Sequence, residues 1–267
     1  MTNDRLRVAW VTGASRGIGR GVAVALGSAG WTVWVSARSS TDHGLTTHLP
    51  GTVDSVAAEV TAAGGNGIAR QCDHSDDGQV SALVDEIAAA GPLHLLVNNV
   101  WGGYEQLNAG HWEEWNAPLW QQPLALFDAM FTHGVRAHYV ASALCAPLLM
   151  RSAPAAVVTI SMEVGAAHSA EHGVGYSMAK AADDRLALAL AGQLAADRVA
   201  SIALHPGLVR TEGVLQFRDF FDLKDSQSPE GVGRVVAAFA ADFDSMALTG
   251  RALGVQDLAG RYRIDIS

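Results

Sequence analysis

Apolar and polar positions follow two alternating rhythms along this chain. Short β-branched or apolar runs are separated by longer, alanine-rich stretches with helical spacing. The short runs predict seven strands, at Val8–Val11, Thr32–Ala37, Gly67–Cys72, Leu93–Asn98, Ala155–Ser161, Val199–Leu204 and Arg251–Val255. The longer stretches predict helices, among them Val53–Ala63, Gln79–Ala89, Leu124–Met150 and Gly175–Ala196. Because strands that alternate with helices pair in parallel, the pattern predicts an α/β fold with helices on both faces of one sheet.

Length and composition favour one large unit. The chain has 267 residues, of which 49% are hydrophobic, and it shows no linker, internal repeat or low-complexity tract. We therefore expect a single domain spanning residues 1–267. A net charge of −9 argues against nucleic acid or an anionic membrane as a partner, since either would favour a basic surface.

Three features of the sequence indicate the cellular compartment. The segment Met1–Arg5 has no apolar signal core, and no uncharged apolar run reaches the roughly 18 residues of a membrane helix. The two cysteines, Cys72 and Cys145, are far apart and form no C-x-x-C pair, which favours free thiols. Together these features predict a cytoplasmic protein.

A glycine turn stands between the first strand and the first helix. The segment Thr12–Gly19 reads TGASRGIG and precedes the apolar helical stretch Val22–Leu26. Gly13, Gly17 and Gly19 would let backbone N–H groups approach a pyrophosphate, and the following helix would direct its positive end at the same charge. The turn therefore predicts a bound dinucleotide, with a purely structural turn as the alternative.

A second candidate pair lies on the helical stretch that begins near Gly175. Tyr176 and Lys180 are four residues apart, so both side chains occupy one helix face. An ammonium beside a phenol stabilises the phenolate and brings its pKa from near 10 toward the working range of an acid or base. An ordinary surface pair on a helix is the alternative.

These motifs, in this order, resemble the short-chain dehydrogenase/reductase family over nearly the whole chain. The matching segments are Thr12–Gly19, Cys72–Asp73, Asn98–Asn99, Tyr176–Lys180, Pro206–Thr211 and Leu248–Arg251. The resemblance implies a Rossmann-type doubly wound, seven-stranded parallel sheet in a three-layer α/β/α sandwich. It also implies an NAD(P)-dependent oxidoreductase that acts on a small carbonyl or alcohol substrate, and a homodimer or homotetramer.

By the same resemblance, Tyr176 is the general acid or base, Lys180 also holds the nicotinamide ribose, and Thr211 bonds the carboxamide. Asn98 would fix the loop after the fourth strand, and Asp73 would contact adenine. The cofactor residues that the resemblance implies are Gly13, Ser15, Arg16, Gly17, Ile18, Gly19, Arg38, Ser39, Asp73, Asn98, Tyr176, Lys180, Pro206, Gly207, Val209 and Thr211.

Two arginines indicate which cofactor the site would take. Arg16 lies inside the glycine turn, and Arg38 follows the second strand, where an NAD-preferring protein would carry an acid for the ribose 2′-hydroxyl. A guanidinium binds a 2′-phosphate that a carboxylate would repel, so we expect NADP(H), with Ser39 assisting. Solvated surface charges are the alternative.

The chain departs from the family pattern at two catalytic positions. Counting back from Gly165, the family's catalytic serine falls on Met162, whereas Ser161 takes the place of the preceding serine. A shift of one residue would bring Ser161 into the site, so Ser161 is a candidate catalytic residue and Glu163 a conceivable substitute. In the long helix, Gly134 stands where many members carry asparagine, and the adjacent His133 is more typical of a structural residue.

Two aromatic segments accompany the candidate site. Trp101, Tyr104, Trp112, Trp115 and Trp120 lie between the fourth strand and the long helix. They would either wall a hydrophobic substrate pocket or pack a flap or a subunit interface. The stretch Gln216–Ser228 contains Phe217, Phe220 and Phe221 and would serve as a lid.

Two rival functions stay open. The segment His168–His172 fits the H-x-x-E-H pattern of zinc hydrolases, but glycines and a strand surround it, so we expect no metal. The serine and asparagine departures favour a second rival, a weakly active or noncatalytic protein that binds NADP(H).

Overall fold

A computed structural model of the chain describes residues 7–105, 112–164 and 173–267. Seven parallel strands form one sheet in the order β3-β2-β1-β4-β5-β6-β7. The strands are β1 Val8–Thr12, β2 Thr32–Ala37, β3 Asn66–Gln71, β4 Leu95–Asn98, β5 Ala155–Ile160, β6 Val199–His205 and β7 Arg251–Gly254. All seven predicted strands are therefore present, with ends displaced by no more than two residues.

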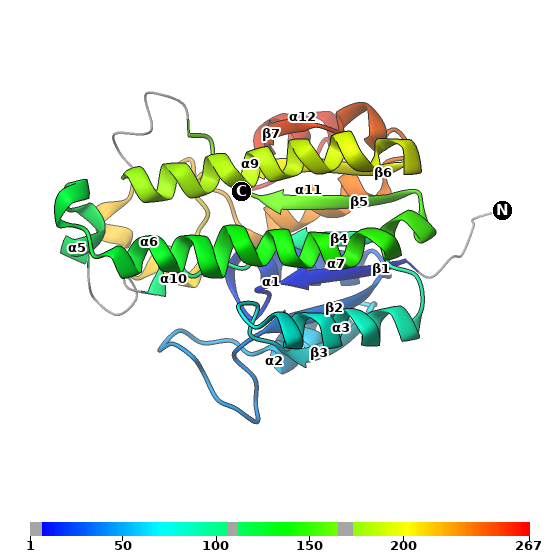
Figure 1. Cartoon of the computed structure of the whole chain (residues 1–267), viewed down its shortest axis with the longest axis horizontal. Helices are drawn as coiled ribbons and strands as arrows, with labels where there is room; N and C mark the ends of the chain where they lie inside the picture. The colour runs from blue at the N-terminus through cyan, green and yellow to red at the C-terminus, as the bar shows by residue number, and fades with distance from the viewer. Residues whose placement is uncertain (1–6, 106–111, 165–172) are drawn as a thin grey trace.

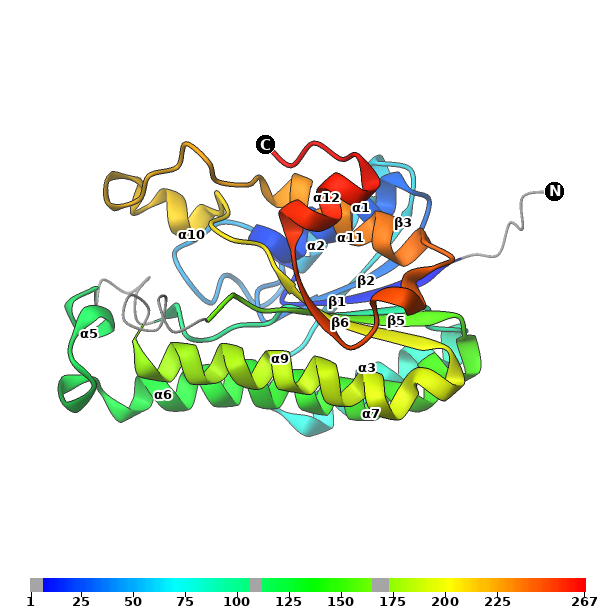
Figure 2. The same cartoon turned by 90° about the horizontal axis from the view of Figure 1, so that it is seen from above.

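Helices cover both faces of the sheet, as Figures 1 and 2 show. One layer holds α1 Gly17–Ser28, α2 Val53–Ala62, α11 Pro229–Ala241 and α12 Val255–Tyr262. The other holds α3 Asp77–Ala90, α6 Leu124–Met130, α7 Ala137–Ser152 and α9 Val174–Leu194. Shorter helices are α5 Trp112–Asn116, α10 Glu212–Leu215, η1 Leu119–Gln121, η3 Ala195–Asp197, η4 Arg218–Phe220 and η5 Ser245–Leu248. The predicted three-layer α/β/α sandwich with a Rossmann-type sheet is confirmed.

The alternation of side chains along each strand supplies two apolar cores. Ala9 and Val11 of β1 pack in the core beneath α1 and α11, whereas Trp10 packs in the core beneath α3 and α7. Because both faces of a parallel sheet are covered, its central strands are apolar at nearly every position. This arrangement brings the carboxyl ends of all seven strands to one edge of the sheet.

The long helix predicted at Leu124–Met150 is interrupted. It is divided into α6 and α7 by a π-helical turn, η2 Phe131–Arg136, and it continues through Pro147 to Ser152. Such π-turns are frequent at functional sites, because they turn side chains off the regular helical stripe. Here the turn places Gly134 against the Trp101 ring.

Two predictions about the cysteines and about membrane helices can be compared with the described residues. Cys72 and Cys145 are both buried and free, as predicted. Among the helices of residues 7–105, 112–164 and 173–267, none combines the length and the apolar character that a transmembrane span needs.

A close helix contact gives a stability prediction. A Cβ on Gly21 of α1 would lie 2.1 Å from the Pro229 carbonyl oxygen of α11, so Gly21→Ala should lower the free energy of unfolding by about 2 kcal/mol. Gly192→Ala on α9 is the control, because its Cβ would meet open space and alanine favours helix by up to about 1 kcal/mol. Urea unfolding measures both changes. Equal stability of the two variants would contradict the packing account.

Candidate active site

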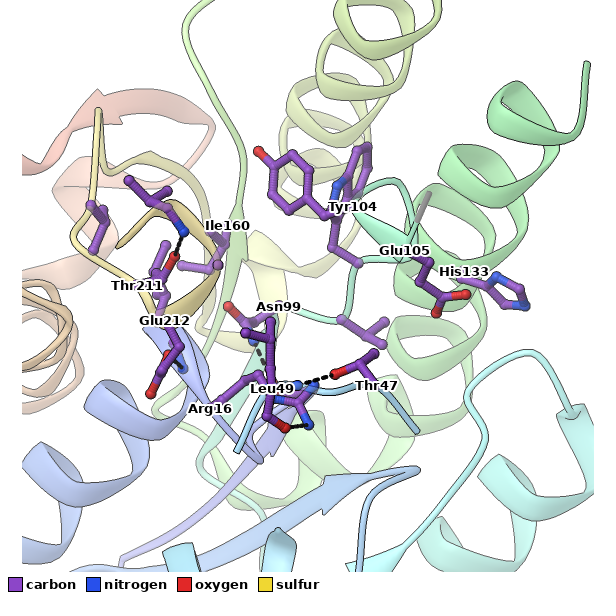
Figure 3. Close-up of a pocket in the computed structure, with 18 of the residues that line it drawn as sticks. Arg16, Thr47, Leu49, Asn99, Tyr104, Glu105, His133, Ile160, Thr211 and Glu212 are labelled. Atoms are coloured by element: carbon purple, nitrogen blue, oxygen red, sulfur yellow. Dashed lines mark hydrogen bonds between the residues drawn. The ribbon is translucent and has the colours of Figure 1, made fainter. Parts of the chain in front are cut away.

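A cavity of about 530 Å³ opens at the carboxyl edge of the sheet. Its walls come from the loops that leave six strands, β1 to β6, and from α9, α10 and η4. Figure 3 shows Arg16, Thr47 and Leu49 on one side, Thr211 and Glu212 on a second, and Tyr104 on a third. A crevice at this edge is where α/β sheets bind ligands.

Most predicted cofactor residues line this one cavity. They are Gly13, Ser15, Arg16, Gly17, Ile18, Arg38, Ser39, Asp73, Tyr176, Lys180, Pro206, Gly207, Val209 and Thr211. Two others, Gly19 and Asn98, are buried and do not line it. The structure thus brings the glycine turn and the Tyr176 helix, which are far apart in sequence, to one site.

The glycine turn is shaped by close backbone contacts. Gly13 and Gly17 have φ values of +62° and +55°, which side chains other than glycine rarely adopt. A Cβ on Gly19 would lie 2.5 Å from the Asn99 amide nitrogen. The turn therefore requires glycine at these positions, and it leaves the amide end of α1 facing the cavity.

The loop after β4 is fixed by Asn99 rather than by Asn98. The Asn99 side-chain amide donates to the carbonyl oxygens of Thr12 and Gly13, both at 3.0 Å, and Asn99 lines the cavity. Asn98 is fully buried, and its amide donates to Ser142 at 2.8 Å instead. The expected role was therefore placed one residue too early, because alternation along a strand turns neighbouring side chains to opposite faces.

Arg16 is held by neutral acceptors. Its guanidinium donates to Ser39 Oγ at 3.2 Å and to the carbonyl oxygens of Leu49, Pro50 and Gly51. Burial lowers the pKa of Arg16 from its ordinary value. A partly desolvated cation with only neutral hydrogen-bond partners at the cavity wall is a suitable partner for an anionic group.

Two neighbouring charged residues, Arg38 and Asp73, already have bonding partners within the protein. Arg38 forms an ion pair with Glu105 from the loop after β4, and both line the cavity. Asp73 accepts from the Ser75 backbone and hydroxyl; these bonds outweigh burial, which acts in the opposite sense, and hold its pKa below the ordinary value. A 2′-phosphate at Arg38 would have to compete with the Glu105 carboxylate.

A carboxylate lies at the amide end of α1. Glu212 Oε2 accepts a hydrogen bond of 2.8 Å from the Gly17 N–H, and Thr211 caps α10 by accepting from the Val214 N–H. The first N–H groups of a helix attract anions. A dinucleotide therefore fits this position by the chemistry of its pyrophosphate, which would take the place of the Glu212 carboxylate.

This contact predicts how cofactor affinity can be raised. Glu212→Gln removes a negative charge that competes for the Gly17 N–H, so NADPH should bind about threefold to tenfold more tightly. Titration calorimetry would measure the dissociation constant. Glu59→Gln, whose carboxylate pairs with Arg20, is the control and should leave it unchanged. Weaker binding by Glu212→Gln would show that the carboxylate is a support of the site.

Tyr176 is surrounded by aromatic rings and a thioether. Its hydroxyl donates to Met162 Sδ at 3.2 Å and lies 3.3 Å from the Tyr104 hydroxyl, while only 5% of the residue is exposed. Burial raises the pKa of Tyr176 well above its ordinary value, and the negative charge of Asp183 adds to the increase. The pKa of Tyr176 is therefore raised, whereas we expected the neighbouring lysine to lower it.

Ser161 and Met162 both line the cavity but face different ways. The Ser161 hydroxyl donates to the Lys180 carbonyl oxygen at 3.0 Å, so it ties β5 to α9. Met162 is the residue next to the Tyr176 hydroxyl. The structure therefore does not bring the Ser161 hydroxyl to Tyr176, and Tyr104 provides the neighbouring hydroxyl instead.

Lys180 has two partners that were not predicted, the partly buried Trp101 and the buried Asp183. Its ammonium lies 4.0 Å from the centroid of the Trp101 ring and donates to Asp183 at 3.1 Å. Asp183 also pairs with His138 of α7 at 2.8 Å. A carboxylate three residues after a lysine on one helix was the available signal for Asp183, whereas the meeting of His138 with α9 depends on tertiary packing.

Part of the aromatic segment walls the site. Trp101, Tyr104 and Trp115 line the cavity, and their ring centroids lie 5.6 to 6.4 Å from that of Tyr176. Trp120 is 82% exposed, and the Trp112 side chain lies outside the described set. A Cβ on Gly134 would lie 2.7 Å from Trp101, so the indole occupies the space that an asparagine side chain would need.

The remaining candidates are placed as follows. Phe217, Phe220 and Phe221 line the cavity, and so does His133. The H-x-x-E-H segment falls within residues 165–172, outside the described residues. Within the described part of the chain, no cluster of three or more His, Cys, Asp or Glu side chains is arranged to hold a metal.

Comparison with known proteins defines the class of protein. The family described as short chain dehydrogenase matches residues 7–220, and the chain belongs to this family. It is an NAD(P)-dependent oxidoreductase by that membership. The chain is 35% identical to mouse (Mus musculus) dehydrogenase/reductase SDR family member 1, over 96% of this chain and 82% of that protein.

Solved structures agree with this fold. A short chain dehydrogenase from Mycobacterium thermoresistibile has a TM-score of 0.80 and 26% identity, covering 96% of this chain and 86% of that one. A 3-oxoacyl-[acyl-carrier protein] reductase from Brucella melitensis, in complex with NAD, has a TM-score of 0.79 and 23% identity, covering 94% and 96%. The second likeness concerns the fold alone.

Proposed function

We propose that this protein is an NADP(H)-dependent carbonyl reductase or alcohol dehydrogenase for a small, hydrophobic substrate. The observation that carries the proposal is the meeting of Tyr176 and Lys180 with the glycine turn in one cavity at the carboxyl edge of the sheet. The rings of Trp101, Tyr104 and Trp115 favour an apolar substrate beside the Tyr176 hydroxyl.

The choice of NADP(H) over NAD(H) rests on charge. Arg16 and Arg38 both line the wall near β2, where a 2′-phosphate would add negative charge. The Brucella melitensis reductase was solved with NAD, so the shared fold alone does not select NADP(H). Two guanidinium groups favour the phosphorylated form in this chain.

The proton chemistry follows from two hydroxyl groups. When bound, the cofactor supplies hydride to a carbonyl carbon or accepts it from an alcohol. Tyr176, protonated because burial raises its pKa, donates a proton to the carbonyl oxygen during reduction. Tyr104, with its hydroxyl 3.3 Å away, supplies the second hydrogen bond to that oxygen, the role for which the family uses serine.

Purified protein with NADPH and a panel of cyclohexanone, benzaldehyde and menadione would test this function. We expect NADPH oxidation with at least one carbonyl compound, followed as loss of absorbance at the nicotinamide band. Tight NADPH binding without turnover on a broad panel would favour the noncatalytic NADP(H)-binding alternative. Metal-dependent peptide cleavage, which the zinc-hydrolase alternative requires, is not expected.

The wider setting is also proposed. We expect a single domain over residues 1–267, a cytoplasmic location and a homodimer or homotetramer. The exposed Tyr139 of α7 and Met178 of α9 support an interface on these two helices. Light scattering would give the oligomeric state, and a monomer at micromolar concentration would contradict it.

A further inference from the structure

A buried row of charged side chains leads from the cavity into the protein. Lys180 donates to one Asp183 oxygen at 3.1 Å, and His138 Nδ1 lies 2.8 Å from the other. His138 Nε2 lies 2.8 Å from the Val100 carbonyl oxygen. Asp183 is 0% exposed and His138 is 1% exposed, so neither can exchange these partners for water.

The hydrogen-bond partners of His138 determine how many protons its imidazole ring carries. An ionised carboxylate only accepts hydrogen bonds, and a carbonyl oxygen only accepts them too. His138 faces one of each, so both of its ring nitrogens must donate, which requires the imidazolium. Burial raises the pKa of Asp183, but the charges of His138 and Lys180 outweigh it and hold that pKa below its ordinary value. An ionised Asp183 is therefore consistent with the geometry.

The net charge of the cluster of Lys180, Asp183 and His138 depends on the protonation of His138. Lys180 and Asp183 alone sum to zero, so the ammonium would do little for a nearby phenolate. A protonated His138 restores one net positive charge. We propose that His138 and Asp183 are positioning residues for the reaction: Asp183 holds the Lys180 ammonium, and the His138 imidazolium cancels the Asp183 charge, so that Tyr176 experiences a positive cluster. The effect on turnover rests on the proposed function, whereas the charge state of His138 does not.

Other titratable groups act on the cluster from neighbouring elements. Tyr104, after β4, contacts the Tyr176 hydroxyl and raises the pKa of Tyr176. His74, after β3, is fully buried, and burial together with the His138 charge lowers its pKa to about 4, so it is neutral. Substitutions at His138 and Asp183 leave both Tyr104 and His74 in place.

Nitrogen NMR of the ¹⁵N-labelled protein at pH 8 tests the charge state without any turnover. Free histidine is neutral at this pH, since its ordinary pKa is near 6.5. We expect both ring nitrogens of His138 to carry protons, with the signal assigned by its loss in His138→Asn. In Asp183→Asn the amide can donate to Nδ1, so His138 should carry one proton. A neutral His138 in the wild-type protein would overturn the proposal.

The pH profile of alcohol oxidation with NADP⁺ tests the effect on Tyr176. The probe is cyclohexanol or the alcohol form of the best carbonyl substrate on the panel. His138→Asn leaves a neutral cluster and should move the midpoint of kcat upward by about one pH unit. Asp183→Asn keeps one net positive charge and should stay at the wild-type midpoint.

The double variant separates charge from structural support. His138→Asn with Asp183→Asn leaves Lys180 as the sole charge, so the midpoint should return to that of the wild type. Residues with a purely structural role would leave the double variant at least as impaired as His138→Asn, and that result would overturn the proposal. Failure of the whole panel would count against the proposed function, while the NMR result would still decide the charge state.

Discussion

Tyr176→Phe should reduce kcat for NADPH-linked ketone reduction by about 10²–10⁴-fold. Phenylalanine keeps the ring contacts with Trp101 and Trp115 but removes the hydroxyl that hands over the proton. The dissociation constant of NADPH should change by less than about twofold, because the lost group acts in the transition state. Steady-state kinetics and fluorescence titration measure the two quantities.

Two further tyrosine variants make this result specific. Tyr139→Phe, on the exposed face of α7, should match the wild type. Tyr104→Phe removes the second hydroxyl and should lower kcat by about 10²-fold, the usual cost of one donor to a developing oxyanion. If Tyr176→Phe retained most of its activity, Tyr176 would not be the proton donor.

Replacing both Arg16 and Arg38 with alanine should weaken NADPH binding by at least about 100-fold. Each guanidinium is expected to donate charge-assisted hydrogen bonds to the 2′-phosphate, and such a bond is worth about 1.5–3 kcal/mol. NADH lacks this phosphate, so its dissociation constant should change by less than about threefold. Calorimetry with both cofactors gives the ratio of the two affinities.

Arg70→Ala is the matched control for charge. Arg70 is a surface residue paired with Glu86, away from the cavity, and its removal should leave both affinities unchanged. Because Arg16 also binds the loop at residues 49–51, the single variant Arg38→Ala shows whether the loss survives without disturbing that loop. An equal loss of affinity for NADH and NADPH would mean that the arginines support the fold and do not bind the 2′-phosphate.

The fold was predictable because its signals are local. Buried parallel strands give continuous apolar runs, and proline and serine mark where α11 begins, as Ser228 and Pro229 do. The π-turn at Phe131–Arg136 was not predictable, since its residues keep helical spacing and contain no proline. Its position depends on how α6 and α7 pack against α9.

The site was predictable where one motif carries the chemistry. The glycine turn and the Tyr176–Lys180 pair lie within short segments, and the structure places them around one cavity. The Ser161 hydroxyl is directed by its contact with Lys180, 19 residues away in sequence. The link from Asp183 to His138 likewise joins residues that are 45 apart. Sequence spacing alone holds no information about such contacts.

A crystal structure of the complex with NADP⁺ tests the central claim most directly. The account predicts the 2′-phosphate between Arg16 and Arg38, the pyrophosphate at the Gly17 N–H in place of Glu212, and the nicotinamide beside the Tyr176 hydroxyl. A nicotinamide ring bound away from Tyr176, with that hydroxyl still bonded to Met162, would contradict it.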